Sequence, residues 1–207
     1  MLEVKLMDYP KSLLDHWKRG DYSFLSSSNA PEYIKDILIV KAEKRPSKRF
    51  FGEAYIASKL GHTMTEGWYS SYKWLTAGKW VTGKNLEPRF ELPFHEALRN
   101  RISTRVIADL QRRSKAYYDR CRSEIGYKNP VAPDLWLIDK NENFMFIESK
   151  MEGDQIKPHQ IAGLALISKY LRGSVLIMCL YQEGKALPNP EIMRKHVDTF
   201  SLIYESV

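Results

Sequence analysis

The second half of the chain alternates between apolar runs and polar breaks, and this pattern predicts strands and helices in a definite order. Residues 134–138 and 144–150 are two short, largely apolar runs with a polar turn between them, which predicts a β-hairpin. Residues 158–171 have apolar positions at helical spacing after an initial proline, which suits the first turn of a helix. Residues 175–181 are apolar throughout, as in a buried strand, and residues 189–204 predict a last helix.

The first half of the chain has weaker patterns. Residues 11–19 predict a short helix, and residues 50–60 predict a second one. The apolar positions within residues 31–40 fit a helix or a strand. Residues 94–123 predict one long amphipathic helix with a basic face. The aromatic segment 67–75 indicates an irregular stretch packed against the core, with stacking on bases as the alternative.

This order of elements predicts an α/β fold with a small mixed β-sheet flanked by helices. The length of 207 residues and the hydrophobic fraction of 43% suit one domain spanning residues 1–207. Within it we expect a helical N-terminal extension, a core that contains a helical and aromatic insertion, and a helical C-terminal extension. These parts correspond to residues 1–45, 50–182, about 62–127 for the insertion, and 188–205.

Composition narrows the class of protein. No apolar run approaches the roughly 18 to 20 residues that a membrane-spanning helix needs, so we expect no membrane partner. The first residues have no apolar segment typical of a signal peptide, which predicts a cytoplasmic protein. Cys121 and Cys179 are far apart in the sequence and outside any zinc-type spacing, so reduced thiols are expected.

The net charge of +7 comes largely from two segments. Lys41 to Arg49 contains five basic residues and one acidic residue, and Arg99 to Arg122 contains eight basic and two acidic residues. Such concentration is typical of a surface that binds a polyanion, nucleic acid above all, although a solvated helix face has the same pattern. The residues that we expect to contact nucleic acid are Arg45, Lys48, Arg49, Arg105, Arg112 and Arg113.

The predicted hairpin has charged residues at one end. Glu148 and Lys150 are two residues apart, so they share a face of their strand, and Asp134 opens the neighbouring strand. Two carboxylates and an ammonium should therefore converge. Burying two carboxylates is costly unless cations compensate, which favours Lys150 together with a hard divalent ion held by carboxylates and the Ser149 carbonyl. Such an ion could activate water, and Lys150 could orient or deprotonate it. A surface hairpin with a salt bridge is the alternative.

These residues carry a resemblance to a known family. Pro133-Asp134, then Glu148-Ser149-Lys150, then Gln160 early in a helix resemble the PD-(D/E)XK nuclease superfamily. Residues 130–170 are most similar to its VRR-NUC-type and Holliday-junction-resolvase-like members.

The resemblance implies a restriction-endonuclease-like core and a site for Mg²⁺ or Mn²⁺. It implies that Asp134 and Glu148 bind the metal, that Lys150 serves the attacking water, and that Gln160 supports the site. Such nucleases usually have one more glutamate on the helix before the sheet. We expect it to be Glu53, a further catalytic and metal-binding residue, with Glu96 as the competitor.

The sequence thus predicts a metal-dependent DNA endonuclease that hydrolyses phosphodiester bonds. Two alternatives stay open: a nuclease-fold protein that binds nucleic acid without cutting, and a structural or interaction protein. The resemblance also allows a homodimer.

Overall fold

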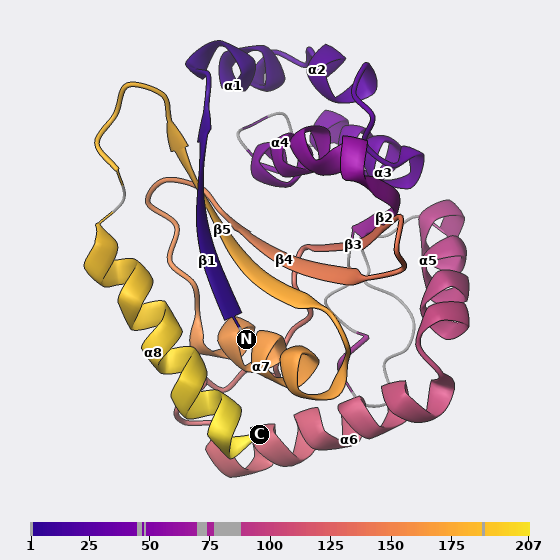
Figure 1. Cartoon of the computed structure of the whole chain (residues 1–207), viewed down its shortest axis with the longest axis vertical. Helices are drawn as coiled ribbons and strands as arrows, with labels where there is room; N and C mark the ends of the chain where they lie inside the picture. Colours follow the sequence, from indigo (N-terminus) through magenta and orange to yellow (C-terminus); the bar gives the residue numbers. More distant parts are fainter. Residues whose placement is uncertain (1, 45–46, 48, 70–73, 77–87, 188) are drawn as a thin grey trace.

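A computed structural model describes the chain except for residues 1, 45–46, 48, 70–73, 77–87 and 188. Its centre is a five-stranded mixed sheet in the order β1-β5-β4-β3-β2 (Figure 1). The strands β1 and β4 both run parallel to β5, whereas β3 runs antiparallel to β4 and to β2. The strands are β1 (Leu2–Tyr9), β2 (Met64–Tyr69), β3 (Leu135–Asp139), β4 (Phe144–Lys150) and β5 (Ser174–Gln182).

Helices cover both faces of this sheet (Figure 1). One apolar core joins the inner sides of the first four helices to Leu135, Leu137 and Ile147 of the sheet. A second core, on the opposite face, joins the later helices to Trp136 and Phe146. The helices are α1 (Lys11–Lys18), α2 (Ser23–Ser26), α3 (Glu32–Lys44), α4 (Phe51–Leu60), the 3₁₀ turn η1 (Gly61–Thr63), α5 (Pro88–Arg101), α6 (Thr104–Cys121), α7 (Pro158–Tyr170) and α8 (Pro190–Ser206).

The α/β class and the small mixed sheet are confirmed, and so is the predicted hairpin. Strands β3 and β4 pair in a register that sets Leu135 opposite Ile147. The turn between them is closed by Asp139, whose carboxylate accepts backbone N–H groups of Asn141 and Asn143 at 2.8 and 2.9 Å. A short polar segment that satisfies its own backbone donors reverses the chain here.

The N-terminal segment differs from the expected helical extension. It begins with strand β1, which pairs with β5, and only then continues into α1, α2 and α3. The alternation of Leu2, Val4 and Leu6 with polar residues is the signal that could have predicted this strand. Residues 31–40, ambiguous in the sequence, belong to helix α3.

The single long helix predicted for residues 94–123 is wrong, because α5 and α6 are separate helices. Ser103 ends the run as the N-cap of α6, and its hydroxyl accepts the backbone N–H of Val106 at 3.4 Å. A serine that satisfies a free donor of the next helix favours a break at this point. None of the described helices is both long and apolar enough to cross a membrane.

The aromatic segment begins with a strand instead of an irregular stretch. Strand β2 pairs with β3 at the sheet edge, and the ring centroid of its Trp68 lies 4.5 Å from that of Tyr33. Trp74, further along, is fully buried. The aromatic residues that the structure describes in this segment therefore pack against the core, as the sequence indicated.

Candidate active site

Asp134 and Glu148 lie next to each other at the end of the β3–β4 hairpin. The pairing of Leu135 with Ile147 places Asp134, one residue earlier, across from Glu148, one residue later. They share a sheet face with Trp136 and Phe146, whose rings stack at 6.1 Å. Both carboxylates are buried, with exposed fractions of 6% for Asp134 and 1% for Glu148.

Lys150 and Gln160 complete a hydrogen-bonded group around Glu148. The Lys150 ammonium donates to Glu148 Oε1 at 2.8 Å and to Gln160 Oε1 at 3.4 Å. The Gln160 amide nitrogen also donates to Glu148 Oε1. In addition, Gln160 Oε1 accepts the backbone N–H of Lys157 at 3.0 Å, which closes the first turn of α7. The start of α7 is thereby tied to the end of β4.

Ser149 connects Asp134 to helix α4. Its backbone N–H donates to Asp134 Oδ2 at 3.0 Å, and its side chain is on the opposite sheet face from Glu148. A Cβ added to Gly52 would lie 2.5 Å from Ser149 Oγ, so glycine lets α4 approach β4 without displacing the Ser149 side chain. This contact brings the next residue of α4, Glu53, to the end of the sheet.

The surroundings of the site strongly raise the pKa values of two of its acids, Glu53 and Glu148. Burial, followed by the charge of Asp134, raises the pKa of Glu53 to about 8. Burial and then Asp134 likewise raise the pKa of Glu148 to about 8, against the lowering effect of Lys150. Repulsion among three carboxylates and poor solvation therefore favour a protonated or cation-compensated site.

The pKa of Lys150 is raised, whereas a lysine that acts as a general base needs a lowered pKa. Burial lowers the pKa of its ammonium, but the charge and hydrogen bond of Glu148, with Asp134, outweigh burial and raise that pKa overall. At neutral pH Lys150 is therefore a cation that donates hydrogen bonds. Its geometry suits orientation and charge neutralisation, the first of the two roles expected from the sequence, better than removal of a proton.

Glu53 and Glu96 have different positions. Glu53 interacts electrostatically with Asp134 and Lys150, whereas Glu96 is an exposed residue of α5 beside a surface hollow that Glu66 and Arg101 also line. The structure therefore brings Glu53, and not its competitor, to the predicted site.

Glu53 makes the stability of the metal-free protein depend on pH. An acid whose folded pKa is raised binds a proton in the folded state that the unfolded chain has already released, so stability falls as pH rises between the two pKa values. For Glu53 this window runs from its ordinary value of 4.5 to about 8. The quantity to follow is the Tm of Glu53→Gln minus the Tm of wild type, both measured in EDTA. We expect this difference to increase by at least about 2–4 °C as the pH rises from 5.5 to 8.5.

The matched control for this measurement is Glu96→Gln, which removes the same charge from an exposed position. Its Tm should follow that of the wild type at every pH. If Glu53→Gln and Glu96→Gln gave the same pH profile, the placement of the half-buried Glu53 beside the buried acids Asp134 and Glu148 would be contradicted.

The acids and the Ser149 carbonyl expected to hold a metal are oxygen donors, the type that Mg²⁺ and Mn²⁺ prefer. Among the described residues, no three His, Cys, Asp or Glu side chains are already arranged as metal ligands. At Glu148, Oε1 already accepts hydrogen bonds from both Lys150 and Gln160. These oxygen atoms suit a hard divalent cation in type and charge, but they are not arranged as a complete coordination shell.

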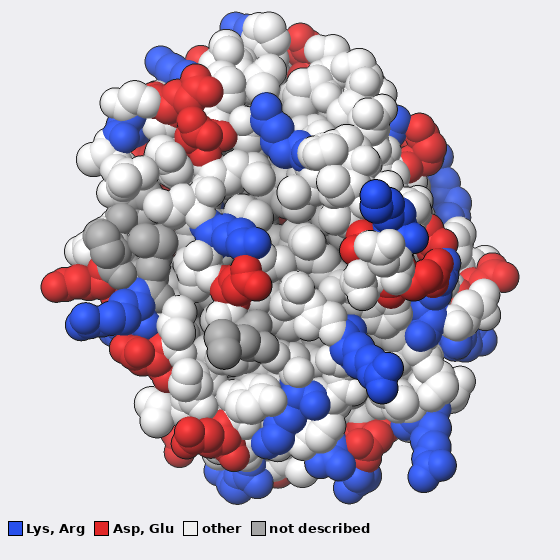
Figure 2. Space-filling model, in the orientation of Figure 1, with Lys and Arg blue, Asp and Glu red and all other residues white. Residues whose placement is uncertain are grey.

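The basic residues expected to contact nucleic acid are not gathered at these acids. Arg45 and Lys48 are outside the described residues, and Arg49 is exposed just before α4. Arg105, Arg112 and Arg113 belong to α6, where Arg113 donates to the Tyr170 hydroxyl at 3.0 Å. Tyr170 ends α7, and Gln160 is in its first turn, so about 15 Å of helix separates them. Basic side chains gather over α6 along the lower edge in Figure 2.

Three residues near the site were given no role from the sequence. Asp154, whose carboxylate accepts the backbone N–H of Met151 at 3.1 Å, contributes to the raised pKa of Glu53. Burial and nearby lysines, Lys150 included, lower the pKa of His159 and of His196. A Gly-Asp pair after the strand was a signal for Asp154, whereas no local pattern marks His196 on the last helix.

Comparisons with models of protein families, with curated proteins and with solved structures found no match for this chain.

Proposed function

We propose that this protein is a metal-dependent DNA endonuclease with a restriction-endonuclease-like core of the PD-(D/E)XK type. The observation that supports the proposal is the convergence of Asp134, Glu148 and Lys150 at one end of a sheet, joined by Gln160 and Glu53. Buried carboxylates that repel one another are unfavourable in a purely structural role, and strongly shifted pKa values mark functional sites. A bound cation that takes part in phosphodiester hydrolysis would compensate the charge of these carboxylates.

Asp134, Glu148, Glu53 and the Ser149 carbonyl are the groups that would hold Mg²⁺ or Mn²⁺. When bound, such an ion supplies charge for the phosphate oxygens and lowers the pKa of a coordinated water. The protein's own contribution is positional. The Ser149 N–H fixes the carboxylate of Asp134, and the approach of α4 through Gly52 fixes the backbone of Glu53.

Lys150 supplies a second positive charge beside the reacting phosphate. Its ammonium has three donors, of which the hydrogen bonds to Glu148 and Gln160 use two. The third can donate to a phosphate oxygen or orient a water molecule. Gln160 acts through the others as a positioning residue, because it hydrogen-bonds Glu148 and Lys150 at once.

Incubation of the purified protein with supercoiled plasmid, single-stranded DNA and branched DNA tests the proposal. We expect nicked or linear products with Mg²⁺ or Mn²⁺ and none with EDTA. If the folded protein bound DNA but cut none of the three substrates with either metal, a nucleic-acid-binding protein without cleavage activity would replace the proposal. Absence of both binding and cleavage would favour a structural or interaction protein. A homodimer and a cytoplasmic location stay predictions.

A further inference from the structure

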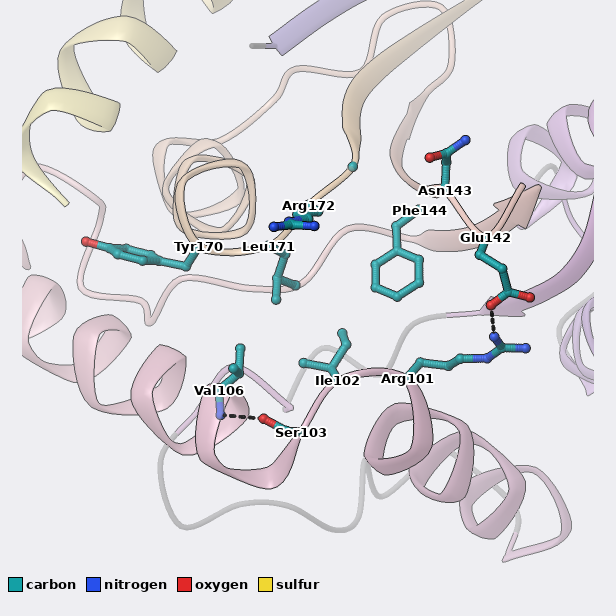
Figure 3. Close-up of a pocket in the computed structure, with 11 residues that line it drawn as sticks. Arg101, Ile102, Ser103, Val106, Glu142, Asn143, Phe144, Tyr170, Leu171 and Arg172 are labelled. Atoms are coloured by element: carbon teal, nitrogen blue, oxygen red, sulfur yellow. Dashed lines mark hydrogen bonds and ion pairs between the residues drawn. The ribbon is translucent and has the colours of Figure 1, made fainter. Parts of the chain in front are cut away.

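Two adjoining hollows lie between α6 and the turn that links α7 to β5, away from the acidic residues. The first has a volume of about 450 Å³ and the second of about 500 Å³, and Val106 and Tyr170 line both. Figure 3 shows the side chains of Ile102, Phe144 and Leu171 pointing into the first hollow. We call the two hollows together the arginine groove, because Arg101, Arg105, Arg112 and Arg172 line them.

The charge of the arginine groove is only partly compensated. Arg101 pairs with Glu66 and Glu142, and its guanidinium is thereby fixed at one side. Arg112 shares Asp109 with Arg113, so one carboxylate faces two cations. Arg105 and Arg172 are exposed and form no ion pair with any residue that the structure describes. The groove therefore offers at least two arginines to an anionic ligand.

The wall of the groove around Tyr170 is held in place. The Arg113 guanidinium lies 4.2 Å from the centre of the Tyr170 ring, and the Tyr170 hydroxyl donates to the Val207 carbonyl oxygen at 3.1 Å. These contacts fasten the end of α7 to α6 and to the C-terminal residue. A preformed groove loses little entropy when a ligand binds.

The groove and the acidic site are at opposite ends of the same strand. Phe144, the first residue of β4, lines the groove, and Lys150, the last, belongs to the site. Seven residues of strand correspond to about 20 Å. The basic segment Arg99 to Arg122, which we expected to contact nucleic acid, therefore forms a surface separate from the acidic site. Substitutions in it can be tested without disturbing the acids.

We propose that the arginine groove binds a single strand of nucleic acid, separately from the acidic site. Arginines on the rim can bind the phosphates of a nucleic-acid backbone, because a guanidinium donates paired N–H groups to phosphate oxygens. The half-buried side chains of Phe144 and Leu171 suit sugars and bases, which a free phosphate lacks. A single strand exposes its bases to such side chains, whereas a duplex keeps them stacked and paired inside. The proposal rests on the proposed function only in the choice of nucleic acid as the polyanion.

The test measures binding of the full chain to a fluorescein-labelled single-stranded oligonucleotide of about 12 nucleotides, by anisotropy in EDTA so that no cleavage intervenes. We expect Arg105→Ala/Arg172→Ala to bind at least about tenfold more weakly and to lower the salt dependence by one to two phosphate contacts. Both residues are exposed, so the variant should keep the wild-type Tm. The matched control is Arg99→Ala/Arg122→Ala, which removes two exposed arginines of the basic segment that line neither hollow.

Unchanged affinity in the groove variant would overturn the proposal, and so would an equal loss in the control, which would indicate bulk charge alone. A larger loss for a duplex of the same length than for the single strand would overturn the assignment to single strands. Plasmid cleavage is measured separately. A wild-type protein that cuts nothing while only the groove variant loses binding would refute the nuclease and leave the groove proposal standing.

Discussion

Asp134→Asn should lower metal-dependent DNA cleavage roughly 100- to 1,000-fold and leave DNA binding within about twofold of wild type. The carboxylate of Asp134 is buried beside Glu148 and interacts with Glu53, so its charge is central to any cation held there. Asparagine keeps an oxygen that can accept the Ser149 N–H, so the hairpin end should keep its shape. Single-turnover cleavage of a labelled DNA, with binding measured separately, gives both values.

Two further variants sharpen this result. Lys150→Ala should also abolish cleavage with binding kept, but it leaves Glu148 buried without its ammonium partner, so its Tm must be measured first. Glu96→Gln, an exposed change far from the acids, should cut at the wild-type rate. Full activity of Asp134→Asn would remove Asp134 from the reaction and with it the main support for a nuclease.

The parts of the site that the sequence predicted are the local ones. Asp134, Glu148 and Lys150 are brought together by a hairpin, and a hairpin is specified by residues close in sequence: two apolar runs and a polar turn. The position of Gln160 could be predicted for a similar reason. Pro158 marks the start of a helix, and only a short loop separates the first turn of this helix from the end of β4.

The position of Glu53 could not be settled in this way. Whether α4 or α5 supplies the additional acid depends on which helix packs against the sheet end, and chain separation from Asp134 does not decide it. The deciding contact is between Gly52 and Ser149, two residues distant in sequence. Strand β1 was missed for a related reason, since its partner β5 lies near the other end of the chain.

The basic segment shows a different limit of the sequence. A cluster of arginines predicts a charged surface, but it carries no information on which end of the sheet that surface covers. Helix α6 packs against α7 near Tyr170, so its arginines are at the end of the sheet away from Glu148. The expectation that these arginines contact nucleic acid stays a prediction, and the groove proposed above gives it a location separate from the acids.

Gly163→Ala should destabilise the protein by about 3 kcal/mol, or about 6–12 °C in Tm, despite the better helix propensity of alanine. Gly163 is inside α7, where an added Cβ would overlap the carbonyl oxygen of Val131 and lie 2.7 Å from its carbon. Both are backbone atoms, so no side chain can rotate away. The Val131 N–H donates to the His159 carbonyl oxygen at 3.2 Å, which holds the two segments together.

Ser168→Ala is the control on the same helix. The Ser168 hydroxyl is buried without a hydrogen-bond partner among the described residues, so alanine should be neutral or slightly stabilising. Thermal unfolding of both variants, at one pH and in EDTA, separates a steric clash from a general effect of alanine in α7. A wild-type Tm for Gly163→Ala would show that α7 and the segment before Asp134 can move apart freely. In that case Gln160 could not hold Glu148 and Lys150 in position, because it depends on the same close approach of α7 to the hairpin.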